Sequence, residues 1–210
     1  MKIKVCGITQ VEQLIQLDEL GIDFAGLIFV ESSSRYVLNK IKRDEFDKLN
    51  LRIKKTGVFV NAAIEDVISK IEAYHLDAVQ LHGEEDPNYC RTLQDYARVI
   101  KAFRIGKPGD NNIDSIVNPY KDSCNYYLFD TYSEKEQGGT GKRFEWGILE
   151  GNEIGKSFFL SGGIGLDNVD EIRSFKHPFF YGTDINSRME ATPGIKDMDR
   201  VRQFKFKIEK

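Results

Sequence analysis

The feature of this sequence that most constrains its fold is a regular alternation of strand-like and helix-like segments along the whole chain. Eight short apolar runs have the length and composition of buried strands: residues 3–8, 24–30, 56–61, 77–83, 98–105, 125–131, 157–163 and 179–185. Helical patterns lie between them at residues 9–21, 41–50, 64–75, 86–96, 145–151, 166–175 and 198–209. Thr9 is the expected N-cap of the first helix and Gly21 its expected end.

Strands that alternate with helices form parallel βαβ units, and eight such units fit a closed barrel. We therefore predict an α/β fold: a single (β/α)8 domain, the TIM-barrel architecture, over residues 1–210. The chain is shorter than the roughly 250 residues typical of this fold, so the connections must be compact. Glycine, prolines and paired asparagines in residues 106–120 leave room for only a short fifth helix. The competing architecture is an open doubly wound sheet, but no G-x-G-x-x-G follows the first strand.

Composition narrows the function classes. The formal net charge of -3 gives no general field for nucleic acid or an anionic membrane surface, so an anionic ligand must be captured locally. The apolar runs are far shorter than a membrane-spanning helix, and the N-terminal residues lack the apolar segment of a signal peptide. Three dispersed cysteines and three histidines show no metal-ligand spacing, so we expect free thiols and no metal. The expectation is a cytoplasmic protein whose oligomeric state, a homodimer included, stays open.

In a (β/α)8 barrel the active site lies at the carboxyl ends of the strands. The sequence places chemically active residues at several of these ends: Cys6, Arg35, His82, Asp130, the stretch SGGIG (161–165) and the stretch TDINS (183–187).

The loops after the seventh and eighth strands are typical of a phosphate site. Gly162 and Gly163, before a helix expected near Leu166, would leave backbone N–H groups open to an anion, and Ser187 adds a hydroxyl. The alternative is that the two glycines only turn the chain. GGTGK (138–142) lacks the spacing of a nucleotide-binding P-loop, and we interpret it as a flexible loop over the site or an ordinary solvent loop.

Cys6 and Asp130 carry the sharpest hypothesis. Strand alternation puts Lys4 with Cys6, and Leu128 with Asp130, on faces that we expect to form the barrel interior. Partial burial would raise the pKa of Asp130 and suit it to donate a proton, whereas a nearby basic residue and helix N-termini would help Cys6 to lose one. An acid and a base across a small substrate indicate an isomerisation. Taken alone, Cys6 is more often a packed core cysteine.

Two further residues have a functional and a structural interpretation. Arg35 offers a bidentate fork for a substrate carboxylate, or it is a solvated loop arginine. His82 could orient a substrate group, or it could form hydrogen bonds within the barrel rim.

The motifs together resemble the phosphoribosylanthranilate isomerase family of tryptophan biosynthesis. The likeness rests on these stretches: KVCGIT (4–9), AGLIF with SRYV (25–29, 34–37), DAVQLHG (77–83), LFDT with GGTGKRFEW (128–131, 138–146), SGGI with NV (161–164, 168–169), and TDINSRME with PGIKD (183–190, 193–197).

The resemblance implies an Amadori rearrangement of N-(5-phosphoribosyl)anthranilate to 1-(2-carboxyphenylamino)-1-deoxyribulose 5-phosphate, without metal or organic cofactor. It implies Cys6 as general base and Asp130 as general acid. Arg35 matches the contact with the anthranilate carboxylate. Gly162, Gly163, Asp184, Asn186 and Ser187 match the phosphate region. The stretch DINSR departs from the D-V-S-S-G common in the family, and VESSS before Arg35 lacks the family's proline and lysine, which puts side-chain contacts in doubt.

Three alternatives remain. One is the aminoaldose isomerase of the histidine pathway. The chemistry of that family resembles catalysis by an aspartate pair, and its chain is longer, with a visible half-barrel repeat. Another is a catalytically silent phosphosugar-binding barrel, although both Cys6 and Asp130 are present. The third is a thiol hydrolase, which requires Cys6 and His82 within hydrogen-bond reach.

Overall fold

The predicted barrel is confirmed. The structure is a computed structural model that describes residues 1–106, 112–131 and 145–210. Eight parallel strands close in chain order, and the first strand pairs with the last. They are β1 (Lys2–Cys6), β2 (Phe24–Ile28), β3 (Lys54–Phe59), β4 (Ala78–Leu81), β5 (Arg98–Ile105), β6 (Tyr126–Thr131), β7 (Phe158–Leu160) and β8 (Phe180–Ile185).

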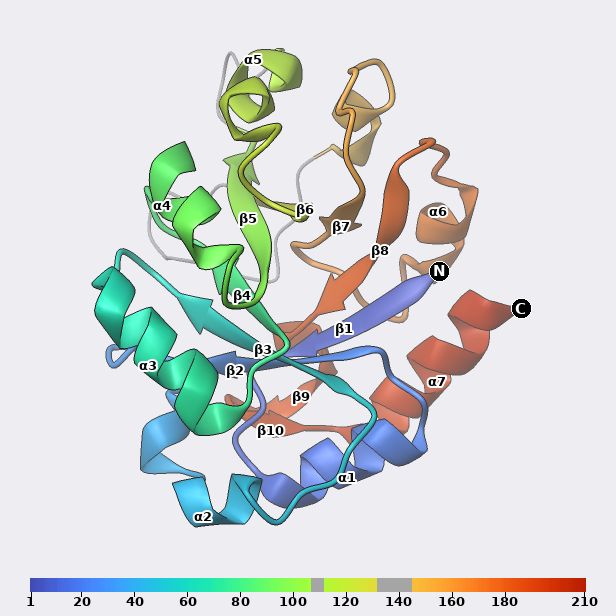
Figure 1. Cartoon of the computed structure of the whole chain (residues 1–210). Helices are drawn as coiled ribbons and strands as arrows, with labels where there is room; N and C mark the ends of the chain where they lie inside the picture. Colours follow the sequence, from blue (N-terminus) through green and yellow to red (C-terminus); the bar gives the residue numbers. More distant parts are fainter. Residues whose placement is uncertain (107–111, 132–144) are drawn as a thin grey trace.

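Helices surround the barrel (Figure 1). The α-helices are α1 (Val11–Glu19), α2 (Arg43–Phe46), α3 (Ile64–Tyr74), α4 (Pro87–Leu93), α5 (Ile113–Val117), α6 (Val169–Ser174) and α7 (Met198–Glu209). Short 3-10 turns are η1 (Val37–Asn39), η2 (Asn118–Tyr120), η3 (Trp146–Leu149) and η4 (Ser187–Met189). As predicted, the fifth helix is short, because Asn118 and Pro119 begin a 3-10 turn directly after it.

Four local predictions are corrected. The N-cap of α1 is Gln10, because the Thr9 hydroxyl instead donates to the Gly194 carbonyl at 2.6 Å. The predicted helix at 41–50 is the single turn α2, and the one at 145–151 is only the 3-10 turn η3. The helix expected from Leu166 begins at Val169, where Asn168 folds back and accepts the Gly165 N–H at 2.9 Å. Gly21, with φ +68°, does end α1.

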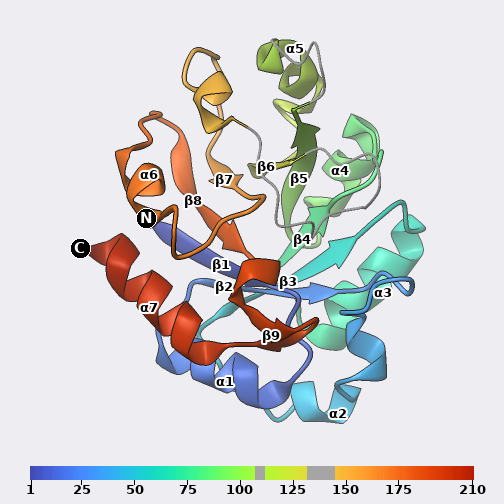
Figure 2. The ribbon, with the colours of Figure 1, turned by 180° about the vertical axis from the view of Figure 1, so that it is seen from behind.

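A hairpin of β9 (Glu190–Thr192) and β10 (Ile195–Lys196) was not predicted. It follows β8 and lies beside α1 and α7, as Figure 2 shows from behind. Two hydrogen bonds fasten it to the segment after β1: the one from Thr9 and one from the Gln13 amide to the Lys196 carbonyl at 3.0 Å.

The core has two parts. Outward-facing strand residues pack under the helices, whereas a second apolar cluster lies inside the barrel: Phe24, Ala78, Ile100, Ala102, Leu128 and Phe159. Leu128 in this cluster confirms that the face of β6 that also carries Asp130 points inward. This apolar layer excludes water below the carboxyl ends of the strands, where the polar residues gather.

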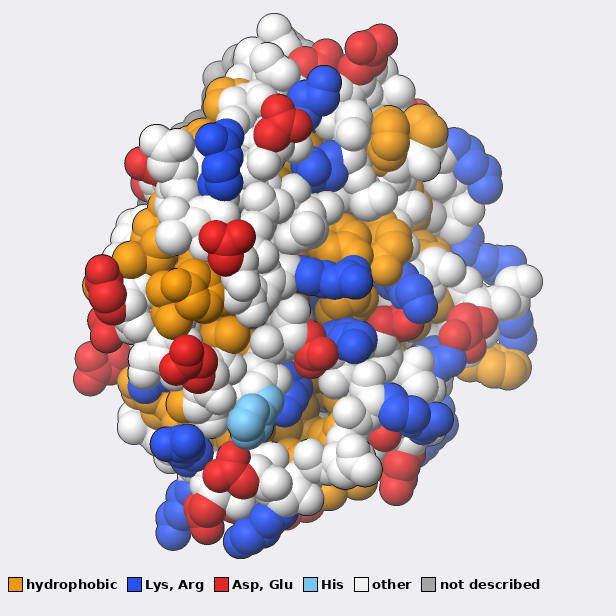
Figure 3. All heavy atoms as spheres, in the orientation of Figure 1, with side chains coloured by type: hydrophobic (Ala, Val, Ile, Leu, Met, Phe, Trp, Pro, Cys, Tyr) orange, Lys and Arg blue, Asp and Glu red, His pale blue; other side chains and the backbone are white. Residues whose placement is uncertain are grey.

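Surface charge agrees with the sequence. Lysine and arginine side chains are mixed with aspartate and glutamate over the face seen in Figure 3, without a broad basic field. Within the described ranges no helix is long and apolar enough to cross a membrane.

Candidate active site

The residues predicted for the site meet at one end of the barrel. Cys6 ends β1, His82 follows β4, and Asp130 is the next-to-last residue of β6. The remaining predicted residues lie in β8 or in the loops after β2, β7 and β8: Arg35, Gly162, Gly163, Asp184, Asn186 and Ser187. Because parallel strands put their carboxyl ends at one rim, segments far apart in sequence converge there.

The Cys6 thiol is buried beside a buried ion pair. Gly26, opposite Cys6 on β2, leaves room for the sulfur, since a Cβ there would lie 2.7 Å from Sγ. Lys4, on the same face of β1, places its ammonium 2.9 Å from Asp184 Oδ2. Asp184 is thus turned toward Lys4 inside the barrel, and its carboxylate offers no hydrogen-bond donor to a phosphate.

The protonation expected for Cys6 is wrong for the free protein. Burial raises the pKa of the thiol, and the opposing charge of Lys4 does not offset it. Cys6 is therefore a thiol, not a thiolate, at neutral pH.

Asp130 lies beside His82 and Gln80 at the rim. His82 Nε2 lies 3.3 Å from Asp130 Oδ2, and the Gln80 amide lies 3.0 Å from His82 Nδ1. Both ring nitrogens of His82 thus face Gln80 and Asp130 rather than Cys6.

The raised pKa expected for Asp130 is also wrong for the free protein. Burial raises the pKa of this carboxyl, but hydrogen bonds from His82, the Thr131 N–H at 2.8 Å and Ser161 together hold it below its ordinary value. Sequence shows the apolar residues before Asp130 but not the donors that the fold brings to it.

Arg35 is held by a carboxylate that sequence analysis missed. Its Nε and Nη2 donate to the two oxygens of Glu190, at 2.9 and 2.7 Å. Glu190 also accepts from Lys196 Nζ at 2.7 Å and from the Gly194 N–H at 3.0 Å. Burial alone would raise the pKa of Glu190, but Arg35 and Lys196 lower it below its ordinary value. One carboxylate faces two cations, so the cluster keeps a net positive charge close to Cys6.

Glu190 and Lys196 were present in the stretches RME and PGIKD that carried the family resemblance, yet no role was predicted for them. The only available signal was an acid and a lysine flanking a glycine after the last strand. Lys196 Nζ also donates to Asn186 Oδ1 at 2.8 Å, which commits that side-chain oxygen.

The loop after β7 turns at the two glycines that were predicted for the anion cradle. Gly162 and Gly163 have φ of +84° and +67°, conformations that favour glycine. The Gly163 carbonyl accepts hydrogen bonds from Asn168 Nδ2 and Arg188 Nη1, both at 2.9 Å. The Gly163 carbonyl and the Ile164 N–H belong to one peptide group. Because a trans peptide directs its N–H opposite to its C=O, these two hydrogen bonds turn the Ile164 N–H away from Arg188. Ser187 opens η4 in the neighbouring loop. The GGTGK stretch (138–142) lies outside the described residues.

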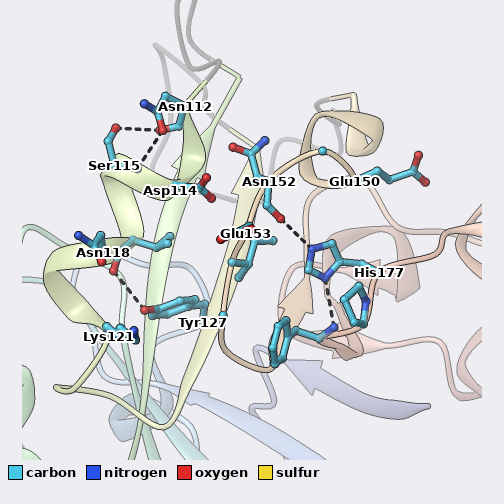
Figure 4. Close-up of a pocket in the computed structure, with 16 residues that line it drawn as sticks. Asn112, Asp114, Ser115, Asn118, Lys121, Tyr127, Glu150, Asn152, Glu153 and His177 are labelled. Carbon is cyan, nitrogen blue, oxygen red and sulfur yellow. Dashed lines mark hydrogen bonds between the residues drawn. The ribbon is translucent and has the colours of Figure 1, made fainter.

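A separate cavity of about 900 Å³ lies on the outer wall of the barrel (Figure 4). It is bordered by α5, by residues 150–155 and by His177, whose ring is bonded to the Asn152 carbonyl at 3.2 Å. None of the residues predicted for the site lines it. Within the described ranges no cluster of three metal-ligating side chains occurs.

The fold and the site define a class: a (β/α)8 barrel that brings a buried cysteine, a buried aspartate and a glycine loop together at the carboxyl ends of its strands. The family model of N-(5'-phosphoribosyl)anthranilate (PRA) isomerase matches residues 3–206, and the chain therefore belongs to this family of isomerases of tryptophan biosynthesis.

Individual relatives agree. N-(5'-phosphoribosyl)anthranilate isomerase of Parabacteroides distasonis is 43% identical over 97% of this chain and 91% of its own. Phosphoribosyl anthranilate isomerase of Thermotoga maritima has a TM-score of 0.86 at 31% identity, covering 100% of this chain and 98% of its own. Another solved isomerase, in complex with reduced 1-(o-carboxyphenylamino)-1-deoxyribulose 5-phosphate, has a TM-score of 0.78 at 30% identity, with 100% and 98% coverage.

Proposed function

We propose that this chain converts N-(5-phosphoribosyl)anthranilate to 1-(2-carboxyphenylamino)-1-deoxyribulose 5-phosphate, with Asp130 as general acid and Cys6 as general base. The observation that carries the proposal is the convergence of these two buried groups at the carboxyl rim, beside a glycine cradle and a net-positive arginine cluster. The solved relative that holds a reduced form of the product supports the choice of substrate.

The proposed steps are redox-neutral. The Asp130 carboxyl gives its proton to the ribose ring oxygen, the bond from that oxygen to C1 breaks, and the nitrogen lone pair forms a C1=N Schiff base. The Cys6 thiolate then removes the proton from C2 to give an enolamine. The enolamine gains a proton at C1 and loses the C2 hydroxyl proton, which leaves the ketone.

These steps need Asp130 protonated and Cys6 ionised, the reverse of the resting state described above. The substrate brings negative charge, which favours the neutral form of Asp130. For Cys6 the nearby cations must supply the opposite effect. The proposal thus requires that substrate binding changes the protonation of the site: Asp130 gains a proton and Cys6 loses one.

Arg35 is the proposed ligand of the substrate carboxylate. Glu190 fixes the direction of its guanidinium, and Lys196 leaves the cluster cationic although Arg35 is paired. The proposed phosphate site consists of Gly162, Gly163, Asn186 and Ser187 with backbone donors. Asp184 does not contact the phosphate in this proposal. It pairs with Lys4 and lies in β8 just before Asn186 and Ser187. His82 acts on Asp130, whose carboxylate lies 3.3 Å from its Nε2.

The test is the decay of phosphoribosylanthranilate fluorescence, with substrate generated in place from anthranilate and phosphoribosyl pyrophosphate by the preceding enzyme. We expect fast decay with the natural chain and loss of most turnover in Cys6→Ala and in Asp130→Asn. Matched controls are Cys124→Ala, a buried thiol under the helices, and Asp23→Asn at the amino end of the barrel. Near-normal turnover in either site variant would remove the role proposed for that residue.

The same preparation separates the alternatives. Turnover of the histidine-pathway aminoaldose instead of phosphoribosylanthranilate would favour that isomerase, and phosphate binding without any turnover would favour a silent barrel. The thiol hydrolase loses support because the ring nitrogens of His82 lie 3.0 Å from the Gln80 amide and 3.3 Å from the Asp130 carboxylate. The cytoplasmic location stays a prediction.

A further inference from the structure

Lys4 is a buried charge that the proposed mechanism does not use. Its side chain is 0% exposed, on the interior face of β1. Lysine is almost never fully buried unless it is paired, because removing an ammonium from water costs several kcal/mol. Its partner is Asp184, the register neighbour on β8, with Nζ 2.9 Å from Oδ2. A pair of apolar residues could hold β1 to β8 as well, so the ion pair calls for a further explanation.

The explanation lies two residues along the same strand face, at Cys6. Lys4 and Cys6 are two residues apart on the same face of β1 and both are buried, so the ammonium and the sulfur share the barrel interior. The charge of Lys4 lowers the pKa of Cys6, although burial raises it more. A thiolate in this buried position would have little contact with water, so its stability depends on neighbouring charges. Lys4 is a cation on the same strand face as Cys6, and its side chain is 0% exposed, so a substrate at the rim cannot displace it.

Charged groups on other elements also affect the ionisation of Cys6. Asp184 on β8 opposes the thiolate, whereas Lys196 on β10 favours it. Lys196 is shared with Glu190, which also holds Arg35 from the loop after β2. Across the rim, the His82–Asp130 pair belongs to β4 and β6. The charges of Lys4 and Lys196 thus favour the thiolate, whereas burial and the charge of Asp184 oppose it.

We propose that Lys4 is a positioning residue that stabilises the Cys6 thiolate, and that Asp184 holds the ammonium in place while limiting its effect on the sulfur. The inference rests on the proposed function insofar as Cys6 is the base. Its statement about the sulfur, however, can be tested without any turnover.

The test is the rate at which a small alkylating reagent modifies Cys6 at several pH values, followed by peptide mass spectrometry. The rate below the thiol pKa is proportional to the thiolate fraction. We expect Lys4→Met to slow the modification of Cys6 about tenfold, the effect of one pKa unit. Asp184→Asn removes the opposing charge and should accelerate the modification. General damage to the barrel would accelerate both variants, because it would expose the thiol.

Cys90 and Cys124 provide an internal control in the same digest. Both are buried, and burial raises the pKa of each to about 12, so their modification reports opening of the chain. The rate for Cys6 is therefore expressed relative to theirs. If Lys4→Met fails to fold, the double variant Lys4→Met/Asp184→Asn leaves no unpaired buried charge. It should still alkylate Cys6 more slowly than Asp184→Asn, and Lys4→Arg should recover part of the rate.

Two results would overturn the proposal: an unchanged relative rate in Lys4→Met, or a shift of both single variants in one direction. The activity of Cys6→Ala separates this inference from the proposed function. If that variant keeps its turnover while the alkylation rates shift as expected, Cys6 is not the base, but Lys4 still controls its ionisation. If turnover is lost and the rates do not shift, the base role stands and Lys4 is only structural.

Discussion

Replacing Glu190 with glutamine would remove the charge at the centre of the Arg35 cluster with little change of shape. The carboxylate of Glu190 accepts four hydrogen bonds, two from Arg35 and one each from Lys196 and the Gly194 N–H. Its side chain is 4% exposed and that of Lys196 is 0% exposed. Burial already lowers the pKa of Lys196, so Glu190→Gln would leave this lysine without its counterion, to remain an unpaired ammonium or to give up its proton, and both states are unfavourable relative to the ion pair.

The cost follows from that geometry. Breaking a buried ion pair by removing one partner typically costs about 3–5 kcal/mol, and the lower value applies here because the glutamine oxygen can still accept one bond. With a urea m-value of about 2 kcal/mol per M, a loss of about 3 kcal/mol would lower the unfolding midpoint by about 1.5 M. We also expect weaker substrate binding, seen as a higher KM, because Arg35 loses the carboxylate that orients it.

The assay is urea unfolding followed by the fluorescence of Trp146, the single tryptophan, which is buried. Glu209→Gln is the matched control, since Glu209 forms only an exposed pair with Lys205 and should not shift the midpoint measurably. Because the pKa of Glu190 is lowered on folding, its contribution is complete above the ordinary glutamate pKa and is lost as the pH falls through the lowered value. A midpoint within about 0.3 M of the natural chain at neutral pH would refute the reasoning, since it corresponds to well under 1 kcal/mol.

Two further substitutions test the cradle and the acid. Gly162→Ala forces a φ of +84° on alanine, which costs about 1–2 kcal/mol, and puts a Cβ 2.1 Å from Thr131 Oγ1. We expect it to lose both stability and binding of inorganic phosphate by calorimetry. Gly155→Ala has a similar φ of +66° without the clash and should lose only stability, so equal phosphate binding in both would count against the cradle. His82→Asn removes the imidazole that lies 3.3 Å from Asp130 and lowers its pKa, so the acidic limb of the kcat/KM profile should move to higher pH. An unmoved limb would show that Asp130 does not control it.

The barrel could be predicted from sequence because its strands are covered on both faces. Such strands are continuous apolar runs, and all eight runs correspond to strands of the barrel. The helices were harder to bound where packing overrides the pattern. Residues 145–151 have helical spacing, yet in the structure they form only a 3-10 turn over Trp146–Leu149. The position of the site followed from the same alternation, since it depends only on which strand ends meet.

The pairing within the site could not be predicted in this way. Glu190 and Arg35 are 155 residues apart, and in the sequence the segment around Gly194 has the composition of a solvent loop. The charged side chains of this segment are buried because Glu190 forms ion pairs with both Arg35 and Lys196. The same limit explains the two wrong pKa directions, because the donors to Asp130 and the degree of burial of Cys6 are properties of the assembled rim.

The interior of the barrel explains why the two kinds of prediction differ. Its lower layer is apolar, as with Leu128, and tolerates any well-packed set of such residues. Its upper layer holds buried polar atoms that have no hydrogen-bond partner among the described residues, including Gln80 Oε1 and Asp184 Oδ1. Each such atom costs free energy, and a fold keeps it where a ligand or a moving proton makes use of it. A sequence pattern shows that polar residues occur at the carboxyl ends of the strands. The ionisation of Cys6, in contrast, depends on its burial and on the opposing charges of Lys4 and Asp184 in the folded barrel.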